Sequence, residues 1–141
     1  MVKLIKLYNS FNIKNYHKGS IILIGNFDGL HLGHQKLFSL AKSYKKKYSL
    51  KIGVLTFEPM PKMYFNKDIK NFRISSQKQK IKLLNKLNVD FVIIKKFNKK
   101  FSKMKSINFI ENVLKKKLKP KFIFVSNNFR FGNKREGNVK Q

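Results

Sequence analysis

Apolar and polar positions alternate along the chain in two recurring patterns. Short, almost continuously apolar runs are typical of buried strands, and stretches with apolar residues three and four apart are typical of amphipathic helices. The predicted strands are 2–8, 20–25, 51–57, 89–95 and 121–125. The predicted helices are 34–47, 76–87 and 106–118. Because buried strands that alternate with helices form parallel sheets, the pattern predicts an α/β fold, a Rossmann-like doubly wound parallel sheet with helices on both faces.

Side-chain spacing also predicts how the helices pack and where they begin. The apolar face of the first helix should comprise Leu37, Leu40, Ala41 and Tyr44. The stretch "SQKQ" at 76–79 fits a capping box at the start of the second helix. Ser106 can cap the third helix. The apolar residues of that helix are Ile107, Ile110, Val113, Leu114 and Leu118.

Three conspicuous loops each follow a predicted strand directly. They are 25–34, 57–61 and 126–132. In a doubly wound sheet, ligands bind outside the carboxyl ends of the strands. We therefore expect the three loops to converge on one edge of the sheet and to form the functional site there.

The stretch "GNFDGLHLGHQ" at 25–35 joins a predicted strand to a predicted helix. A helix that starts near Gly33 directs free N–H groups and the positive end of its dipole into the crevice, which favours phosphate. His31 and His34 flank this helix start with imidazoles that can donate hydrogen bonds to phosphate oxygens. Two other interpretations of the histidines are a metal site, which lacks a third ligand, and a structural role in a tight turn.

Composition narrows the classes of protein and of partner. The net charge is +27, which invites nucleic-acid binding, but the lysines are spread over the whole chain and only three residues are arginine. A compositional bias explains this pattern better than a nucleic-acid site does. The chain has no cysteine, which fits a reducing compartment. No apolar run approaches the ~18 residues of a membrane span, and the start lacks the features of a signal peptide, so we expect a cytoplasmic protein.

Three motifs carry a resemblance to a known family. "HLGH" resembles the H-x-G-H signature of the HIGH-type nucleotidyltransferase superfamily. The longer "IGNFDGLHLGHQKLF" is similar to the N-terminal FMN adenylyltransferase module of bacterial bifunctional riboflavin kinase/FAD synthetases. "VLTFEPMP" resembles that family's T-F-x-P-H-P loop, and "FVSNNFRFG" resembles its V-G-x-[ND]-F-R-F-G loop. The three motifs stand in the family's order along the chain.

The resemblance implies an FMN adenylyltransferase, which transfers AMP from ATP to FMN and releases FAD and pyrophosphate. It implies that His31 and His34 are catalytic and contact the ATP phosphates. The nucleotide-binding positions that it implies are Gly25, Phe27, Gly33, His31 and His34. The positions that match the flavin side are Phe57, Pro59 and Asn128. Mg²⁺ should accompany ATP, held mostly by phosphate oxygens and water.

The sequence departs from this family at several places. Met60 stands where the family often has histidine, and Ser126 replaces a glycine. Residues 1–141 contain neither the family's later Ser/Thr-rich segment ending in arginine nor a riboflavin kinase module. We therefore expect a single nucleotidyltransferase domain that lacks its C-terminal part and forms FAD slowly. The stretch "SKMKS" at 102–106 resembles a loop of tRNA synthetases, but it precedes a mid-domain helix and we interpret it as chance.

Two alternative functions stay open at this point. One is another HIGH-type activity, that of a cytidylyltransferase or a pantetheine-phosphate adenylyltransferase. The other is a basic module that binds nucleic acid, for which arginines and aromatic residues should gather on one face. The loops that contain "TFEPMP" and "NNFRFG" favour the flavin substrate, with ATP and FMN as partners.

Overall fold

The computed structural model describes residues 4–27, 32–58, 77–125, 130–132, 135 and 137–138. Its strands are β1 (Lys6–Tyr8), β2 (Ile21–Ile24), β3 (Ile52–Glu58), β4 (Phe91–Lys96), β5 (Phe122–Phe124), β6 (Arg130–Phe131) and β7 (Gly137–Asn138). Its helices are η1 (Asn15–His17), α1 (Leu32–Tyr48), α3 (Gln77–Lys86), α4 (Lys99–Ser102), α5 (Ser106–Asn108) and η3 (Phe109–Leu118).

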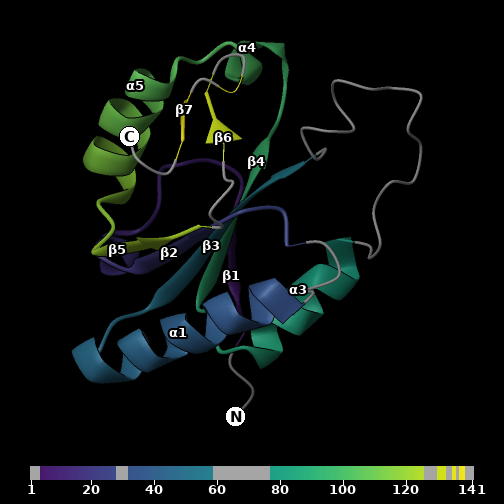
Figure 1. The fold of residues 1–141 in the computed structure, drawn as a ribbon, viewed down its shortest axis with the longest axis vertical. Coiled ribbons are helices and arrows are strands. Elements are labelled where there is room, and N and C mark those ends of the chain that lie inside the picture. Colours follow the sequence, from purple (N-terminus) through teal and green to yellow (C-terminus); the bar gives the residue numbers. More distant parts are fainter. Residues whose placement is uncertain are drawn as a thin grey trace.

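Five parallel strands form the main sheet, in the order β1-β4-β3-β2-β5. Helices α1 and α3 cover one face of this sheet, and α4, α5 and η3 lie on the other side (Figure 1). The predicted fold class, a doubly wound α/β sheet, is therefore confirmed. None of the described helices is long and apolar enough to cross a membrane.

Strand β2 shows why the strands are continuously apolar. Its four residues, Ile21–Ile24, are all buried. Ile21 and Leu23 pack in the core layer beneath α1 and α3, whereas Ile22 and Ile24 pack in the layer beneath η3. Successive side chains of a strand point to opposite faces, so a strand covered on both sides must be apolar at every position.

Helix α1 packs on the core with most of the predicted residues, but Leu40 is exposed and Phe38 is buried in its place. Phe38 and Ala41 are 3% and 0% exposed and belong to the core, whereas Leu40 is 45% exposed. Leu37 and Tyr44 pack at the margin of the core, as partly buried residues. The prediction for Leu40 was wrong because the apolar stripe of the helix is wider than the face that the sheet can cover.

The third predicted helix is present but begins and winds differently. Lys105 is its N-cap position and makes no side-chain capping bond, so the predicted cap at Ser106 was wrong. After α5 the chain continues as the π-helix η3, whose buried residues are Phe109, Val113 and Leu118. Their spacing of four and five residues suits the wider π turn. Ile107, which the α-helical pattern placed on the apolar face, is 51% exposed.

Other short elements lie where the sequence pattern predicted loops. Asn98 Oδ1 accepts a hydrogen bond of 2.8 Å from Phe101 N and caps the one-turn helix α4. Strands β6 and β7 pair antiparallel at the end of the chain. Between them Gly132 has φ +82°, and a Cβ there would lie 2.7 Å from the Ser106 nitrogen. Only glycine therefore fits where this segment meets α5.

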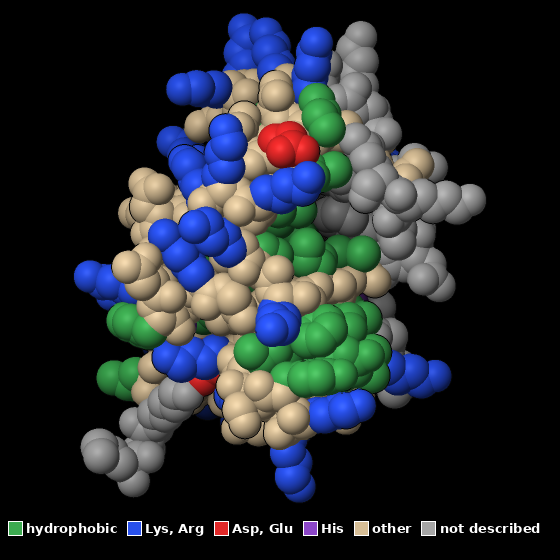
Figure 2. Space-filling model, turned by 90° about the vertical axis from the view of Figure 1, so that its left-hand side faces the viewer, with side chains coloured by type: hydrophobic (Ala, Val, Ile, Leu, Met, Phe, Trp, Pro, Cys, Tyr) green, Lys and Arg blue, Asp and Glu red, His purple; other side chains and the backbone are tan. Residues whose placement is uncertain are grey.

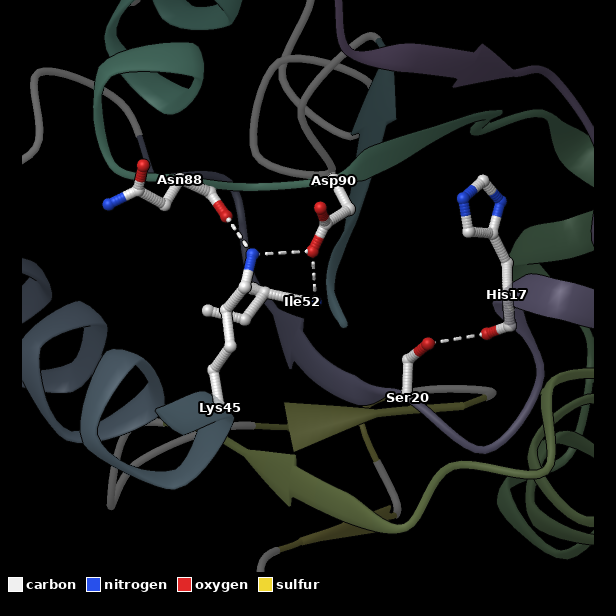
Figure 3. Close-up of polar contacts among 6 residues, drawn as sticks. All are labelled: His17, Ser20, Lys45, Ile52, Asn88 and Asp90. Atoms are coloured by element: carbon white, nitrogen blue, oxygen red, sulfur yellow. Dashed lines mark hydrogen bonds and ion pairs between the residues drawn. The ribbon is translucent and has the colours of Figure 1, made fainter. Parts of the chain in front are cut away.

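The amino edge of the sheet is held by one buried carboxylate. Asp90 Oδ2 accepts a hydrogen bond of 2.8 Å from Ile52 N and forms an ion pair with Lys45 Nζ at 2.9 Å (Figure 3). Lys45 Nζ also donates to the carbonyl oxygen of Asn88 at 3.0 Å. Asp90 thus ties α1 and the starts of β3 and β4 together, at the edge opposite the predicted site.

Candidate functional site

The strand order brings three of the loop-bearing strand ends together. Strands β2, β3 and β4 follow one another across the sheet, but β5 lies on the other side of β2. The chain therefore adds β3 and β4 on one side of β2 and β5 on the other side. The carboxyl end of β2 is thus the topological switch point of the sheet. The end of β2 lies between the ends of β3 and β5, so the described parts of the predicted loops share one edge.

The joint between β2 and α1 is tightly packed. Gly25 donates from its N–H to the Leu55 carbonyl oxygen at 3.1 Å, which keeps the chain in the sheet beyond β2. A Cβ on Gly25 would lie 3.1 Å from the ring of Phe27. Phe27 has φ +52° and is only 2% exposed, so the backbone turns sharply and places this ring in the core.

Phe27 connects the strand end to the predicted phosphate-binding histidine. Its ring meets the His34 imidazole edge to face, with centroids 5.0 Å apart and planes at 74°. It meets Phe38 in the same way at 5.2 Å and 71°. His34 lies in the first turn of α1 and is partly exposed. The Phe27 ring thus limits the orientations of this partly exposed imidazole.

The amino end of α1 suits an anion. The helix begins at Leu32, and Gly33 lies in its first turn, close to the predicted start. The first turn contains no acidic residue, so no side chain of that turn neutralises the positive end of the helix dipole. Free N–H groups at such a helix start bind phosphate oxygens well.

Near this edge, two buried polar atoms find no hydrogen-bond partner among the residues that the structure describes. They are Oδ1 of Asn26, which follows β2, and Oε1 of Gln77, the first residue of α3. A buried acceptor that lacks a donor costs roughly 1–3 kcal/mol, so such atoms are typical of places that a ligand or water completes.

Phe57 lies at the same edge but on the other face of the sheet. It packs against Phe97 at 6.1 Å and Phe101 at 5.4 Å, in the core layer beneath η3. Lys95 Nζ lies 5.8 Å from the centre of the Phe101 ring. The structure therefore gathers Gly25, Phe27 and His34 on one face, and it places Phe57 at the neighbouring strand end on the opposite face.

Several predictions concern residues outside the described part of the chain. These residues are His31, Pro59, Asn128, Met60 and Ser126, and the capping-box residue Ser76 belongs with them. Their assignments stay predictions.

The third histidine has a structural environment. His17 is 4% exposed and stacks on Phe91 with ring centres 4.3 Å apart. Its Nδ1 lies 2.7 Å from the Tyr8 hydroxyl, and Ser20 Oγ donates to its carbonyl oxygen at 2.6 Å (Figure 3). Within the described residues, no three His, Asp, Glu or Cys side chains are grouped so that they could hold a metal ion.

Sequence reasoning missed the surroundings of the site. The aromatic partners of Phe57, namely Phe97 and Phe101, follow β4 and carry no motif. Lys80 of α3 is 1% exposed, and its Nζ lies 3.4 Å from Thr56 Oγ1 beneath the carboxyl end of β3. In a chain with so many lysines, the sequence contains no signal that would distinguish this one from the rest.

Comparison with known proteins agrees with the motifs. The sequence model of the FAD synthetase family matches residues 13–141. A bifunctional riboflavin kinase/FMN adenylyltransferase of Buchnera aphidicola (subsp. Acyrthosiphon pisum) is 44% identical over 128 residues, which are 91% of this chain and 41% of that protein. The protein of the same name from Escherichia coli K12 is 37% identical over 120 residues, 85% of this chain and 38% of that protein. The chain thus spans about two fifths of the length of these relatives.

A solved structure shows the same fold. A crystal structure titled as a macrolide-efflux protein from Streptococcus pneumoniae superposes with a TM-score of 0.81, at 24% identity, over 99% of this chain and 54% of that one. At this identity the likeness concerns the fold alone, a Rossmann-like sheet flanked by helices. The family match over most of the sequence establishes that this chain belongs to the FAD synthetase family and corresponds to the N-terminal FMN adenylyltransferase part of the bifunctional proteins.

Proposed function

We propose that this chain is an FMN adenylyltransferase that transfers AMP from ATP to FMN in the cytoplasm. A phosphate oxygen of FMN attacks the α-phosphorus of ATP and forms a new P–O bond. The bond from the α-phosphorus to the oxygen that bridges it to the β-phosphate breaks, and FAD and pyrophosphate result. Such transfers need little covalent help from the protein, which mainly positions the reactants and stabilises charge.

The observation that carries this proposal is the contact between Phe27 and His34 at the amino end of α1. It supports a nucleotide site in which the triphosphate lies against the helix start at Gly33. His34, together with His31, donates hydrogen bonds to the phosphate oxygens as negative charge shifts to the leaving pyrophosphate. Mg²⁺ enters with ATP as part of that substrate and is held mainly by the phosphates and water.

We place the flavin beside the ends of β3 and β5. Phe57, Pro59 and Asn128 match the family positions on that side, and Phe57 belongs to an aromatic cluster with Phe97 and Phe101. Flat rings of this kind pack well against another aromatic ring system.

The direct test is incubation of the chain with FMN, ATP and Mg²⁺, with FAD measured by chromatography. We expect FAD to form and the double variant His31→Ala/His34→Ala to form none detectable. Each lost donor should raise the barrier by about 3 kcal/mol, the typical effect of one oxyanion-hole donor. Circular dichroism of the variant should match the parent, because His34 is partly exposed. Near-normal turnover of the double variant, or adenylylation of phosphopantetheine in preference to FMN, contradicts the proposal.

A further inference from the structure

Lys80 is an exceptional lysine in this protein. Among the lysines that the structure describes it alone is buried, with 1% of its surface exposed, and the others lie at or near the surface. A compositional excess of lysine explains lysines on the surface, because a solvated ammonium group there costs little folding free energy. It does not explain a buried ammonium group, which loses its hydration and is expensive to keep inside a protein.

The side chain of Lys80 reaches the end of a central strand. Lys80 lies in α3 one turn before Leu84, and its Nζ lies 3.4 Å from Thr56 Oγ1, which is fully buried. Thr56 pairs with Ile94 of β4 and is followed directly by Phe57. The bond therefore joins α3 to β3 just before the chain leaves the sheet.

We propose that Lys80 is a positioning residue for the flavin substrate and that it acts through Thr56. This inference rests on the proposed function, in which Phe57 and Pro59 contribute to the flavin side. The end of β3 is held on one face by the Lys80–Thr56 bond and on the other by the packing of Phe57 against Phe101. Phe57 and Glu58 then continue β3 in register with Lys95 and Lys96 of β4. Losing the bond should therefore shift this last part of the strand and the Phe57 ring that it carries.

The nucleotide side should be much less sensitive to Lys80. His34 and Gly33 belong to α1, and the support of His34 comes from Phe27 at the end of β2. Loss of the Lys80–Thr56 bond should therefore weaken FMN binding more than ATP binding. If Lys80 had only a structural role, another result would be expected. Replacing a buried charge with an apolar residue of similar volume is often neutral or stabilising for the fold, so both affinities should stay unchanged.

The test compares substrate affinities in the full 141-residue chain. Quenching of FMN fluorescence reports flavin affinity, and calorimetric titration with Mg·ATP reports nucleotide affinity. We expect Lys80→Met to weaken FMN binding about tenfold, equivalent to about 1.4 kcal/mol, with ATP affinity within about threefold of the parent. Lys82→Met removes the same charge from an exposed position of α3 and should change neither affinity.

Two substitutions of Thr56 give a second test. Thr56→Val removes the hydroxyl at nearly constant volume and should weaken FMN binding as Lys80→Met does, whereas Thr56→Ser retains the hydroxyl and should bind FMN like the parent. If the bond between Lys80 and Thr56 carries the effect, the double variant Lys80→Met/Thr56→Val should lose no more FMN affinity than Lys80→Met alone, because that bond is already absent.

The outcomes separate this inference from the proposed function. A parent chain that binds neither FMN nor ATP overturns the proposed function and this inference with it. A parent that binds both, together with a Lys80→Met and a Thr56→Val variant of unchanged FMN affinity, overturns the inference alone. Equal losses of FMN and ATP affinity, accompanied by a large fall in melting temperature, also overturn it, since they indicate general packing.

Discussion

At the scale of single residues, Phe27 links the fold to the chemistry. Its positive φ turns the ring into the core, where it contacts both Phe38 and the imidazole of His34. The orientation of a partly exposed histidine therefore depends on a side chain that is 2% exposed. Substituting Phe27 and Phe38 one at a time should therefore separate an effect on nucleotide binding from an effect on the stability of the fold.

We predict that Phe27→Leu and Phe38→Leu destabilise the fold alike and differ in their effect on ATP. Each substitution shrinks one ring of the same core cluster and should lower the free energy of unfolding by about 1–2 kcal/mol. Only Phe27→Leu removes the ring that contacts His34, so only this variant should bind ATP several-fold more weakly. Urea unfolding and calorimetric titration measure the two effects. Equal ATP affinities in the two variants would show that the ring contact does not orient His34.

At the scale of elements, the amino and carboxyl edges of the main sheet differ in how their polar groups are hydrogen-bonded. At the carboxyl edge, Asn26 Oδ1 finds no hydrogen-bond partner among the described residues, whereas Asp90 at the amino edge bonds a strand N–H and pairs with a lysine. Asp90 is almost completely buried, with 2% of its side chain exposed. The amino edge therefore stabilises the arrangement of α1, β3 and β4, and the carboxyl edge is where we propose that the substrates bind.

We predict that Asp90→Ala lowers the free energy of unfolding by about 2–4 kcal/mol, because it leaves the Ile52 N–H buried without an acceptor. The matched control is Glu111→Ala, which removes an exposed i,i+4 pair with Lys115 and should cost about 0.5 kcal/mol or less. Urea denaturation of both variants measures the difference. A loss from Asp90→Ala as small as that from Glu111→Ala would mean that the amino edge is held by packing alone.

At the scale of the whole molecule, charge and apolar surface are distributed differently. Figure 2 shows lysine and arginine side chains scattered over one face, with no continuous basic patch. Hydrophobic side chains gather on the same face, on the side where β5 and the end of α1 lie. There the Tyr44 ring meets the Phe122 ring edge to face, the Tyr48 ring packs against Phe122 at a tilt of 39°, and Ile123 is 41% exposed. On this face the positive charge should attract polyanions in general and does not form a surface that would recognise a particular one.

We predict that duplex DNA binds weakly and without sequence preference. Lysines that contact phosphates release the counterions of the DNA, so the affinity should fall steeply as the salt concentration rises. At physiological ionic strength the dissociation constant should lie in the range of non-specific binding, about 10⁻⁴–10⁻⁶ M. Fluorescence anisotropy with two unrelated duplexes at two salt concentrations measures this. Tight binding of one duplex and not the other at physiological salt would favour the nucleic-acid module over the nucleotidyltransferase.

Prediction from the sequence was good where the signal is local. Alternating apolar runs predicted the five parallel strands, and the motif at 25–35 predicted a helix start near Gly33, where α1 begins at Leu32. The sequence pattern failed to predict burial where tertiary packing decides which side chains are covered. Leu40 and Ile107 satisfy a helical period and are still exposed, while Phe109 is buried because η3 winds as a π-helix. The roles of His31, Pro59 and Asn128 stay predictions.

By itself, the sequence determined the class of fold and the family, because hydrophobic period and motif order are properties of neighbouring residues. Only the tertiary structure decided the strand order that places the end of β2 between those of β3 and β5. It alone decided that Phe27 supports His34 and that Lys80 is buried against Thr56. These contacts depend on the backbone turn at Phe27 and on the packing of helices against a sheet. Neither is encoded in the local pattern of apolar and polar positions.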